Sequence, residues 1–390
     1  MEIWINRLLT EKLKKAAETR PVVLITGVRQ SGKSSLLQRE FKQADTISFD
    51  HLNQVEAVTD SPDFFLNQFK DQVILDEVQY VPNLFRELKI QVDKDRKNYG
   101  KWILTGSQKF ELMEQVSESL AGRISILQLE TLSAKELRNS PIDNQTEFIW
   151  KGGYPEIWSN PDMDLDDFFE SYVRTYIERD LKTIMEVRNL SDFQRFIRVL
   201  AARIGQLINY KDISNDVGVS DVTIRKWMHA LQISGLVYFL PPFHRNIGKR
   251  LTKSAKVFFA DHGLVCYLLG IKDLAGWNNH IYKGNLWENL VFMELVKTAH
   301  LRPGENLFFY RDQNGVEIDF IVESGNTLYF LEAKAGERID EKKLSFKKVI
   351  PLFEKRYQTK AILLQNLSEP HVLKKKGYHC INPLFADVNL

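Results

Sequence analysis

The residues with the clearest chemical meaning form a phosphate-binding loop. Residues 27–34 read Gly-Val-Arg-Gln-Ser-Gly-Lys-Ser and fit the pattern G-x-x-x-x-G-K-[ST] at every position. The loop lies between an apolar run and a helical stretch, so its N–H groups and the helix N-terminus can surround phosphate oxygens. Lys33 is expected to reach the β- and γ-phosphates, and the Ser34 hydroxyl to ligate Mg²⁺. The predicted nucleotide-binding set is Gly27, Arg29, Gln30, Ser31, Gly32, Lys33, Ser34 and Ser35.

An acid pair and a polar strand end extend this predicted site. The apolar run 73–75 ends in Asp76 and Glu77. We expect Asp76 to hold Mg²⁺ through water and Glu77 to polarise the attacking water as a general base. Ser107, two residues after Thr105 at the end of the next apolar run, is predicted to sense the γ-phosphate or position the water. Thr105 fits this role equally well, and either residue could instead cap a helix.

A second group of polar residues lies near the C-terminus. It comprises Glu288 on a predicted helix over 286–297, Asp319 on a predicted strand over 316–322, and Glu332 and Lys334 on a predicted strand over 327–334. Glu332 and Lys334 share one face because side chains alternate along a strand. Converging carboxylates repel unless a divalent cation binds them. We predict a second metal site for Mg²⁺ or Mn²⁺ with ligands Glu288, Asp319 and Glu332, where Lys334 orients a water or stabilises developing charge.

This C-terminal pattern resembles the core of the PD-(D/E)xK nucleases. The resemblance rests on the helix glutamate, the spaced aspartate, the Glu-x-Lys strand and the lysine-rich helix and strand that follow. It implies an α/β restriction-endonuclease-like fold and metal-dependent cleavage of nucleic acid. Two alternatives stay open: a recognition module without catalytic activity, and a group of surface salt bridges on two amphipathic strands.

The middle of the chain predicts a helix-turn-helix. Helices are expected over 210–217 and 221–233, with a turn at Gly218 and a cap at Ser220. The apolar residues that recur at helical spacing in the second helix, and so predict its buried face, are Ile224, Trp227, Met228 and Leu231. The residues outside that face, which could meet a major groove, are Thr223, Arg225 and Lys226.

A basic wing is predicted to follow. Strands are expected over 235–240 and 257–259, and the tip between them carries five cations and no acid: Arg245, Lys249, Arg250, Lys253 and Lys256. Residues 188–260 hold twelve Lys and Arg against four Asp, a local charge of +8. Such a segment can bind phosphates in a salt-dependent way, which predicts a nucleic-acid partner and favours DNA over RNA without excluding RNA. The alternative is a winged helix that only packs against the rest of the protein.

Most of the chain resembles the AAA+ ATPases of bacteria and archaea. The resemblance is carried by Arg-Gln before the second loop glycine, the Asp-Glu pair, Ile-Leu-Thr-Gly-Ser at 103–107, and the runs 119–123 and 152–156. Within the AAA+ ATPases, the chain most specifically resembles the subfamily whose members carry an uncharacterised C-terminal half. In AAA+ proteins an arginine from a neighbouring subunit often completes the site, which implies a homo-oligomer and makes Arg123 the candidate. Arg123 could instead form a surface or intradomain salt bridge, and Arg179 is a rival that could contact ATP within its own subunit.

The composition limits the class of protein. The 390 residues include 53 Lys and Arg against 51 Asp and Glu, a formal net charge of +2. With 44% apolar and 27% charged residues, the composition is that of a globular protein rather than a disordered or collagen-like chain. No apolar run approaches the roughly 18 residues of a membrane helix. There is no secretory pattern at the N-terminus, and two cysteines make no disulfide framework. We expect a cytoplasmic protein with no membrane partner.

Together these patterns predict an α/β protein. The expected segments are a P-loop AAA+ ATPase core with a parallel sheet over 1–135, a helical lid or linker over 136–205, a winged helix-turn-helix over 206–275 and a nuclease-like domain over 281–390. The leading hypothesis is an Mg²⁺-dependent ATPase coupled to nucleic-acid binding and to cleavage of DNA or RNA. The alternative is a nucleotide-gated binding or signalling protein whose C-terminal domain binds without cutting.

Overall fold

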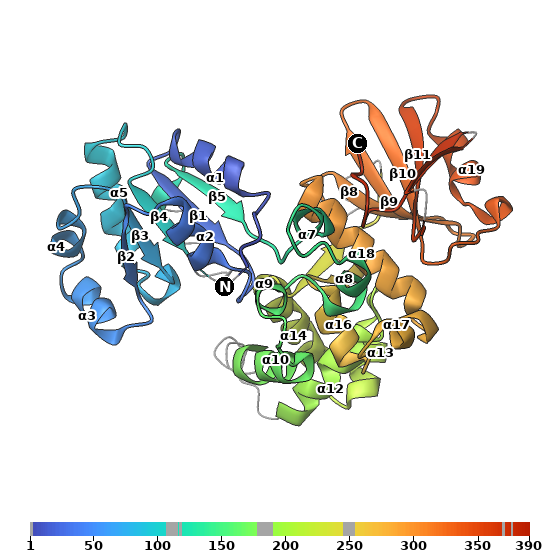
Figure 1. Ribbon diagram of the computed structural model, residues 1–390, viewed down its shortest axis with the longest axis horizontal. Helices are drawn as coiled ribbons and strands as arrows, with labels where there is room; N and C mark the ends of the chain where they lie inside the picture. Colours follow the sequence, from blue (N-terminus) through green and yellow to red (C-terminus); the bar gives the residue numbers. More distant parts are fainter. Residues whose placement is uncertain are drawn as a thin grey trace. The chain divides into compact units, whose positions relative to one another are not determined.

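The structure is a computed structural model of the 390-residue chain. It describes residues 3–106, 116, 119–177, 190–244, 254–368, 371–375 and 377–390. The chain forms two compact units, one made mainly of residues 4–131 and the other mainly of residues 132–390 (Figure 1).

The first unit is built on a five-stranded sheet in the order β2-β3-β4-β1-β5. The strands are β1 Val22–Thr26, β2 Asp45–Ser48, β3 Val73–Asp76, β4 Trp102–Thr105 and β5 Ile124–Gln128. Every pair is parallel, so the predicted parallel sheet is confirmed. The carboxyl ends of the strands therefore meet at one edge, where ligands bind in open sheets of this kind.

Helices cover both faces of this sheet. They are α1 Thr10–Ala17, α2 Lys33–Glu40, α3 Leu52–Asp60, α4 Pro62–Asn67 and α5 Leu84–Lys94. Val22 and Leu24 of β1 pack into a core with residues of α3, α4 and α5, whereas Val23 and Ile25 pack into a second core with α1 and α2. A strand buried on both faces reads as a continuous apolar run, which is why residues 22–25 are all apolar.

The second unit begins with helices and ends with a mixed sheet. Its helices are α7 Ala134–Arg138, α8 Gln145–Lys151, α9 Pro155–Ser159, α10 Leu165–Tyr172, a π-helix Val173–Ile177, α12 Leu190–Ala201, α13 Tyr210–Val217, α14 Asp221–Ile233, α16 His262–Leu268, α17 Leu274–Asn279, α18 Lys283–Thr298 and α19 Phe346–Val349. Strands β6 Val237–Leu240 and β7 Lys256–Phe259 form an antiparallel pair. The six-stranded sheet has the order β12-β13-β11-β10-β9-β8. Its strands are β8 Leu307–Arg311, β9 Glu317–Ser324, β10 Thr327–Lys334, β11 Gln358–Gln365, β12 Val372–Lys375 and β13 Tyr378–Ile381.

The predicted elements of this unit largely coincide with the observed ones. Helices α13 and α14 have the predicted bounds, and Ser220 caps α14 through a bond from Thr223 N to Ser220 Oγ of 3.1 Å. Strands β9 and β10 pair antiparallel, as their hairpin turn predicts. The lysine-rich helix after β10 is replaced by α19 and two 3₁₀ turns, Glu341–Lys343 and Ile350–Leu352. Pro351 contributes to this break because it has no N–H to continue a helix.

Helix α18 packs against the six-stranded sheet. The indole Nε1 of Trp287 donates to the Leu364 carbonyl of β11 at 3.0 Å. The ring of Phe292 lies 6.2 Å from that of Phe320 on β9. In the described part of the chain, no helix is both long and apolar enough to span a bilayer.

Candidate nucleotide site and C-terminal carboxylate group

The phosphate loop joins β1 to α2 at the carboxyl edge of the sheet. Gly27 has φ +148°, and a Cβ there would overlap the Leu129 carbonyl oxygen, so only glycine fits beside that chain. Gly32, at the start of α2, adopts the left-handed conformation with φ 87°. Gln30 also has a positive φ, 58°, which is unusual for a residue with a side chain. Backbone in alternating conformations of this kind forms the concave row of N–H groups that binds anions.

Lys33 lies inside this loop. Its side chain is buried, and Nζ donates to the carbonyls of Gly27 at 3.2 Å and Val28 at 3.0 Å. Burial lowers the pKa of Lys33, while the charges of Glu77 and Asp76 act in the opposite direction. The ammonium is thus held by neutral carbonyl groups close to two carboxylates, in a position to exchange these partners for phosphate oxygens.

Asp76 connects the phosphate loop to the neighbouring strands. The Ser34 hydroxyl donates to the Asp76 carboxylate, with distances of 2.8 and 3.0 Å to its two oxygens. The Thr105 hydroxyl of β4 donates to Oδ1 of the same carboxylate and accepts a bond from Glu77 N at 3.1 Å. Hydroxyl and carboxylate oxygens are the ligands that Mg²⁺ prefers, so this donor set fits the ion.

Glu77 is held in a strained backbone conformation directly after β3. Its φ is 60°, and its carboxylate accepts a hydrogen bond from Gln79 Nε2. Positive φ values at residues with side chains recur at functional sites. Of the two residues that sequence could not separate, Thr105 contacts Asp76 and Glu77, whereas Ser107 lies outside the described residues.

The remaining predicted loop residues differ in exposure. Arg29 donates from Nη2 to the Tyr80 hydroxyl at 3.2 Å. Ser35 is exposed on α2, and Ser31 is fully buried. Within the described part of the chain, the Ser31 hydroxyl oxygen has no hydrogen-bond partner. Ser31 therefore belongs to the loop's packed interior.

Arg123 forms a two-pronged ion pair within its own unit. Its Nε and Nη2 lie 2.7 and 2.9 Å from the two carboxylate oxygens of Asp93 on α5. The hydrogen bond from Arg123 lowers the pKa of Asp93 to about 2. This geometry agrees with the intradomain alternative for Arg123. Its rival Arg179 falls outside the described residues.

Arg7 is a contact of the phosphate loop that sequence reasoning missed. It precedes α1 and is buried, with Nη1 donating to the Ser31 carbonyl at 2.7 Å and Nη2 to the Glu130 carbonyl at 2.5 Å. The signal available in the sequence is an arginine set between the apolar residues Ile5 and Leu9, which are also buried. That pattern indicates a buried cation but does not indicate which groups accept its hydrogen bonds.

The C-terminal carboxylates are arranged differently from the prediction. Lys256 of β7, expected in the exposed basic tip, is only 2% exposed. Its Nζ contacts Glu288 Oε1 at 2.8 Å and also pairs with Glu317. Burial alone would lower the pKa of Lys256, but the charges of Glu288, Asp319 and Glu317 raise it. The assignment of Lys256 to a solvated wing tip is therefore wrong.

The other members of the predicted metal group also have protein partners. Asp319 Oδ2 accepts from Ala333 N at 2.7 Å, and Glu332 Oε1 accepts from Phe346 N at 2.8 Å. Lys334 Nζ lies 3.5 Å from Asp319 and 3.4 Å from Glu332, so Lys334, Asp319 and Glu332 do meet as predicted. Glu288 is paired instead with Lys256, and burial raises its pKa to about 7 against the opposing effect of that lysine. Among the residues that the structure describes, no three or more Asp, Glu, His or Cys side chains are grouped to hold a metal ion.

Helix α14 presents a polar face next to its buried stripe. The predicted apolar stripe is confirmed, since Ile224, Trp227, Met228 and Leu231 are all buried. Arg225 and Lys226 are exposed, and the Arg225 guanidinium lies 4.0 Å from the centre of the Tyr210 ring on α13. The wing tip from Arg245 to Lys253 falls outside the described residues.

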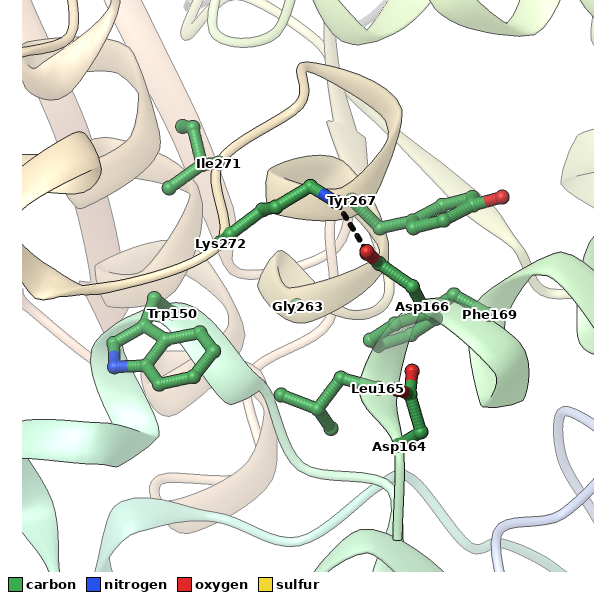
Figure 2. Close-up of a pocket in the computed structure, with 9 residues that line it drawn as sticks. All are labelled: Trp150, Asp164, Leu165, Asp166, Phe169, Gly263, Tyr267, Ile271 and Lys272. Carbon is green, nitrogen blue, oxygen red and sulfur yellow. Dashed lines mark hydrogen bonds and ion pairs between the residues drawn. The ribbon is translucent and has the colours of Figure 1, made fainter.

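A hollow that the sequence did not predict lies in the second unit (Figure 2). It has a volume of about 190 Å³ and aromatic walls that include Trp150, Phe169 and Tyr267. An ion pair between Asp166 and Lys272 crosses its rim. No predicted site residue in the described ranges lines it. The hollow is therefore separate from the carboxylate group of the same unit.

Comparison with known proteins agrees with the site in the first unit. Residues 19–138 match a family described as an AAA domain. Residues 142–275 and 283–381 each match a family described only as a domain of unknown function. The solved structures that resemble the chain include a Walker-type ATPase of Pyrococcus abyssi, 16% identical with a TM-score of 0.43, covering 68% of this chain and 96% of that one. They also include the RuvB Holliday junction branch migration motor of Thermotoga maritima, 16% identical with a TM-score of 0.30, covering 61% of this chain and 90% of that one. These scores are too low to carry a functional argument.

Relatives that align with most of this chain define the family. The parallel sheet, the phosphate loop and the AAA match make the first unit a P-loop ATPase domain of the AAA class. Uncharacterised proteins of Mycobacterium bovis and Mycobacterium tuberculosis are each 32% identical over 326 residues, covering 83% of this chain and 72% of the relative. An uncharacterised protein of Haemophilus influenzae is 25% identical over 356 residues, covering 83% of this chain and 84% of the relative. The chain belongs to the same family as the mycobacterial proteins.

Proposed function

We propose that the first unit binds and hydrolyses MgATP. The observation that carries the proposal is the hydrogen bond between Ser34 and Asp76 beside the buried Lys33. It unites the three groups that a P-loop ATPase needs at the β- and γ-phosphates: a hydroxyl and a carboxylate for Mg²⁺ and a cation for phosphate. Glu77 follows Asp76 and is the general base for the attacking water. Thr105 is a candidate for the residue that aligns the two acids, because its hydroxyl donates to the Asp76 carboxylate and accepts the backbone N–H of Glu77.

The test of the ATPase proposal is the substitution Lys33→Ala. Removing the cation at the γ-phosphate is expected to reduce ATP turnover by roughly a hundredfold or more and to weaken nucleotide binding. Lys14→Ala is the matched control, because Lys14 forms a surface ion pair with Glu40 in the same unit. Turnover of the control should stay within about twofold of the unmodified protein. Equal turnover in the Lys33 variant and the control would refute the assignment.

We propose further that α13 and α14 with the following wing contact nucleic acid, most readily DNA. The proposal is supported by the exposed Arg225 and Lys226 and by the local charge of +8. Each phosphate-binding side chain that is removed should reduce the slope of log affinity against log salt by about one. The double variant Arg225→Ala, Lys226→Ala should therefore show a shallower slope than the unmodified protein. Arg302→Ala, an exposed cation elsewhere in the same unit, should leave the slope unchanged.

For the C-terminal part of the second unit, the position of Lys256 favours a module that binds nucleic acid without cleaving it. The lysine ammonium lies against Glu288 and Glu317, two carboxylates that would otherwise be drawn to a divalent cation. A metal ion beside Asp319 would approach this ammonium and the Lys334 ammonium, and like charges repel strongly in a buried site. The alternative, metal-dependent cleavage through Glu288, Asp319, Glu332 and Lys334, requires Lys256 to move away first.

A cleavage assay separates these two functions. The unmodified protein, Asp319→Ala and Lys256→Met are incubated with DNA and with RNA, with and without Mg²⁺ or Mn²⁺ and with and without ATP. A binding module should show no metal-dependent cleavage in the unmodified protein. Cleavage that depends on metal and is lost in Asp319→Ala, with ATP turnover intact, would establish the nuclease alternative.

A further inference from the structure

We propose that Arg7 is a positioning residue for the nucleotide phosphates. It lies outside the phosphate-loop motif, before the first helix of the unit. Its role rests on the proposed ATPase function and adds the contact that fixes the shape of the phosphate loop.

Arg7 ties together two segments that are far apart in sequence. Nη1 donates to the Ser31 carbonyl, and Nη2 donates to the Glu130 carbonyl, 123 positions away. Glu130 follows Leu129, whose N–H donates to the Thr26 carbonyl at 2.8 Å at the start of the phosphate loop. The guanidinium thus links the late part of the loop to the chain that passes beside its beginning.

The bond to Ser31 fixes the orientation of a peptide group. A trans peptide is planar, with its carbonyl and the following N–H pointing in opposite directions. When Arg7 holds the Ser31 carbonyl on one side, the N–H of Gly32 is directed to the other side. Gly32 has φ 87°, and its carbonyl accepts the Leu36 N–H at 2.9 Å, so it begins α2. The orientation of this N–H is what an anion-binding loop requires at its last turn.

The chain around Arg7 is anchored independently of the guanidinium. Ile5 and Leu9 are buried, and the Trp4 ring lies 4.6 Å from the Arg39 guanidinium on α2. These contacts do not involve the Arg7 head group, so we expect them to persist when it is removed. Loss of that head group should therefore change the phosphate loop more than it changes the fold.

An arginine suits this position because one head group donates to two carbonyls from two different nitrogens. The guanidinium is planar, stays charged and offers five donors in a fixed fork. A lysine ammonium can approach one of the carbonyls but lacks the planar reach between them. Arg7→Lys should therefore retain part of the positioning function, and Arg7→Met, with an apolar side chain, should retain none.

The experiment compares Arg7→Met, Arg7→Lys and Arg20→Met with the unmodified protein. Arg20 is the matched control, because its guanidinium also donates to a carbonyl, that of Gly122 at 3.2 Å, but from an exposed position. ATP turnover is measured across ATP concentrations, and ADP binding is measured by calorimetry well below the unfolding temperature. Arg7→Met is expected to raise KM for ATP and Kd for ADP about tenfold or more, with kcat at saturating ATP within about twofold. Arg7→Lys should fall between, and Arg20→Met should match the unmodified protein.

A purely structural role predicts a different result. If Arg7 only stabilised the fold, Arg7→Met would lower kcat in proportion to the folded fraction and leave KM and Kd unchanged, which would overturn the inference. Equal effects of Arg7→Met and Arg20→Met would overturn it as well. The unmodified protein is measured first, so absent turnover there refutes the ATPase proposal itself. Normal turnover with an unaltered KM in Arg7→Met refutes the role of Arg7 alone.

Discussion

Arg123 shows how a single ion pair can decide between two roles for one residue. Its bond to Ala121 O at 2.9 Å and its two bonds to Asp93 occupy the guanidinium fork. These bonds use three of the five N–H donors and orient the guanidinium toward Asp93, so turning it toward a nucleotide on a neighbouring subunit would break the ion pair. The geometry thus favours a part in holding α5 to the segment before β5.

We therefore expect Arg123→Met and Asp93→Asn each to lower the free energy of unfolding. In the double variant, the two losses should not add. Both variants break the Arg123–Asp93 pair, and Asp93→Asn also removes the pair between Asp93 and Arg96, so the double variant should be no less stable than Asp93→Asn alone. Chemical denaturation of the four proteins measures this coupling. Because the pKa of Asp93 is lowered to about 2, the pair's stability is present above pH 4 and declines as the pH falls toward 2.

ATP turnover distinguishes the intradomain pair from an arginine finger. Per folded molecule, turnover of Arg123→Met should stay within about tenfold of the unmodified protein. A loss of a thousandfold or more, with stability unchanged, would instead assign the finger role to Arg123.

His262, at the first residue of α16, is a buried group with a predictable effect on stability. Burial lowers the pKa of His262 to about 4, although the Asp261 charge and a contact of 2.6 Å with the Phe148 carbonyl oppose this. Below about pH 6.5 the unfolded chain takes up a proton at this residue and the folded chain does not. Stability should therefore fall between pH 6.5 and 4, by up to about 3 kcal/mol from this group alone.

The variant His262→Gln removes the titrating group. Its unfolding free energy should decline less steeply than that of the unmodified protein between pH 7 and 4. The buried Glu294, whose pKa is raised to about 7 chiefly by burial, acts in the opposite direction. It is present in both proteins, so the difference between their pH profiles isolates the histidine. Parallel profiles would contradict the expectation.

At the scale of elements, a close backbone contact joins α8 to α16. Gly152 has φ +78° at the end of α8, and a Cβ there would overlap Asp261 Oδ1 and lie 2.7 Å from Gly263 Cα. The Asp261 carboxylate also accepts from Gly153 N at 2.8 Å and from Gly263 N at 2.9 Å. The run 152–156, which sequence linked only by resemblance to a family, therefore has a packing role in this structure.

We expect Gly152→Ala to lower the unfolding free energy by about 3 kcal/mol or more, because backbone strain and overlap add. Gly270→Ala is the matched control. Gly270 has φ +76°, but no described heavy atom lies within 4 Å of a Cβ placed there. Gly270→Ala should lower the unfolding free energy by about 1 kcal/mol, the effect of placing a side chain at a positive φ alone. Equal losses measured by denaturant unfolding would show that the contact with α16 contributes nothing.

The elements of this protein were predictable where their signal is local. The phosphate loop is eight consecutive residues, and the apolar spacing of α14 lies within thirteen, so both could be recognised without the fold. The partners of Arg7 lie 24 and 123 positions away, and Arg123 and Lys256 pair with Asp93 and Glu288, which lie 30 and 32 positions away. No local pattern indicates which carbonyl or carboxylate such a cation will meet. This is why Lys256 was predicted in a solvated tip and Arg7 was not predicted as part of the site.

For the whole molecule, the division into two units predicts how it unfolds. Residues 4–131 form one unit, and most of residues 132–390 form the other, each with its own buried core. We expect two transitions in a thermal scan. ADP with Mg²⁺ at a hundred times its Kd should stabilise the first unit by about 2.7 kcal/mol, because a ligand stabilises the part that binds it.

Hydrogen exchange assigns the transitions. Peptides from β1, β3 and β4 should gain protection with ADP, whereas peptides from α12 to α14 should keep theirs. The variant Lys33→Ala serves as control and should show no gain. A single transition that moves as a whole with ADP would contradict the division.

Cutting the chain between β7 and α18 would separate a counter-ion from its carboxylates. A fragment that begins at residue 283, where the third family match starts, retains Glu288, Glu317 and Asp319 but loses Lys256. The uncovered acids would then repel one another and attract divalent ions from the buffer. If such a fragment bound metal ions or cleaved DNA or RNA, that property would be a result of removing Lys256. The intact chain is the only form in which the chemistry of these carboxylates can be judged.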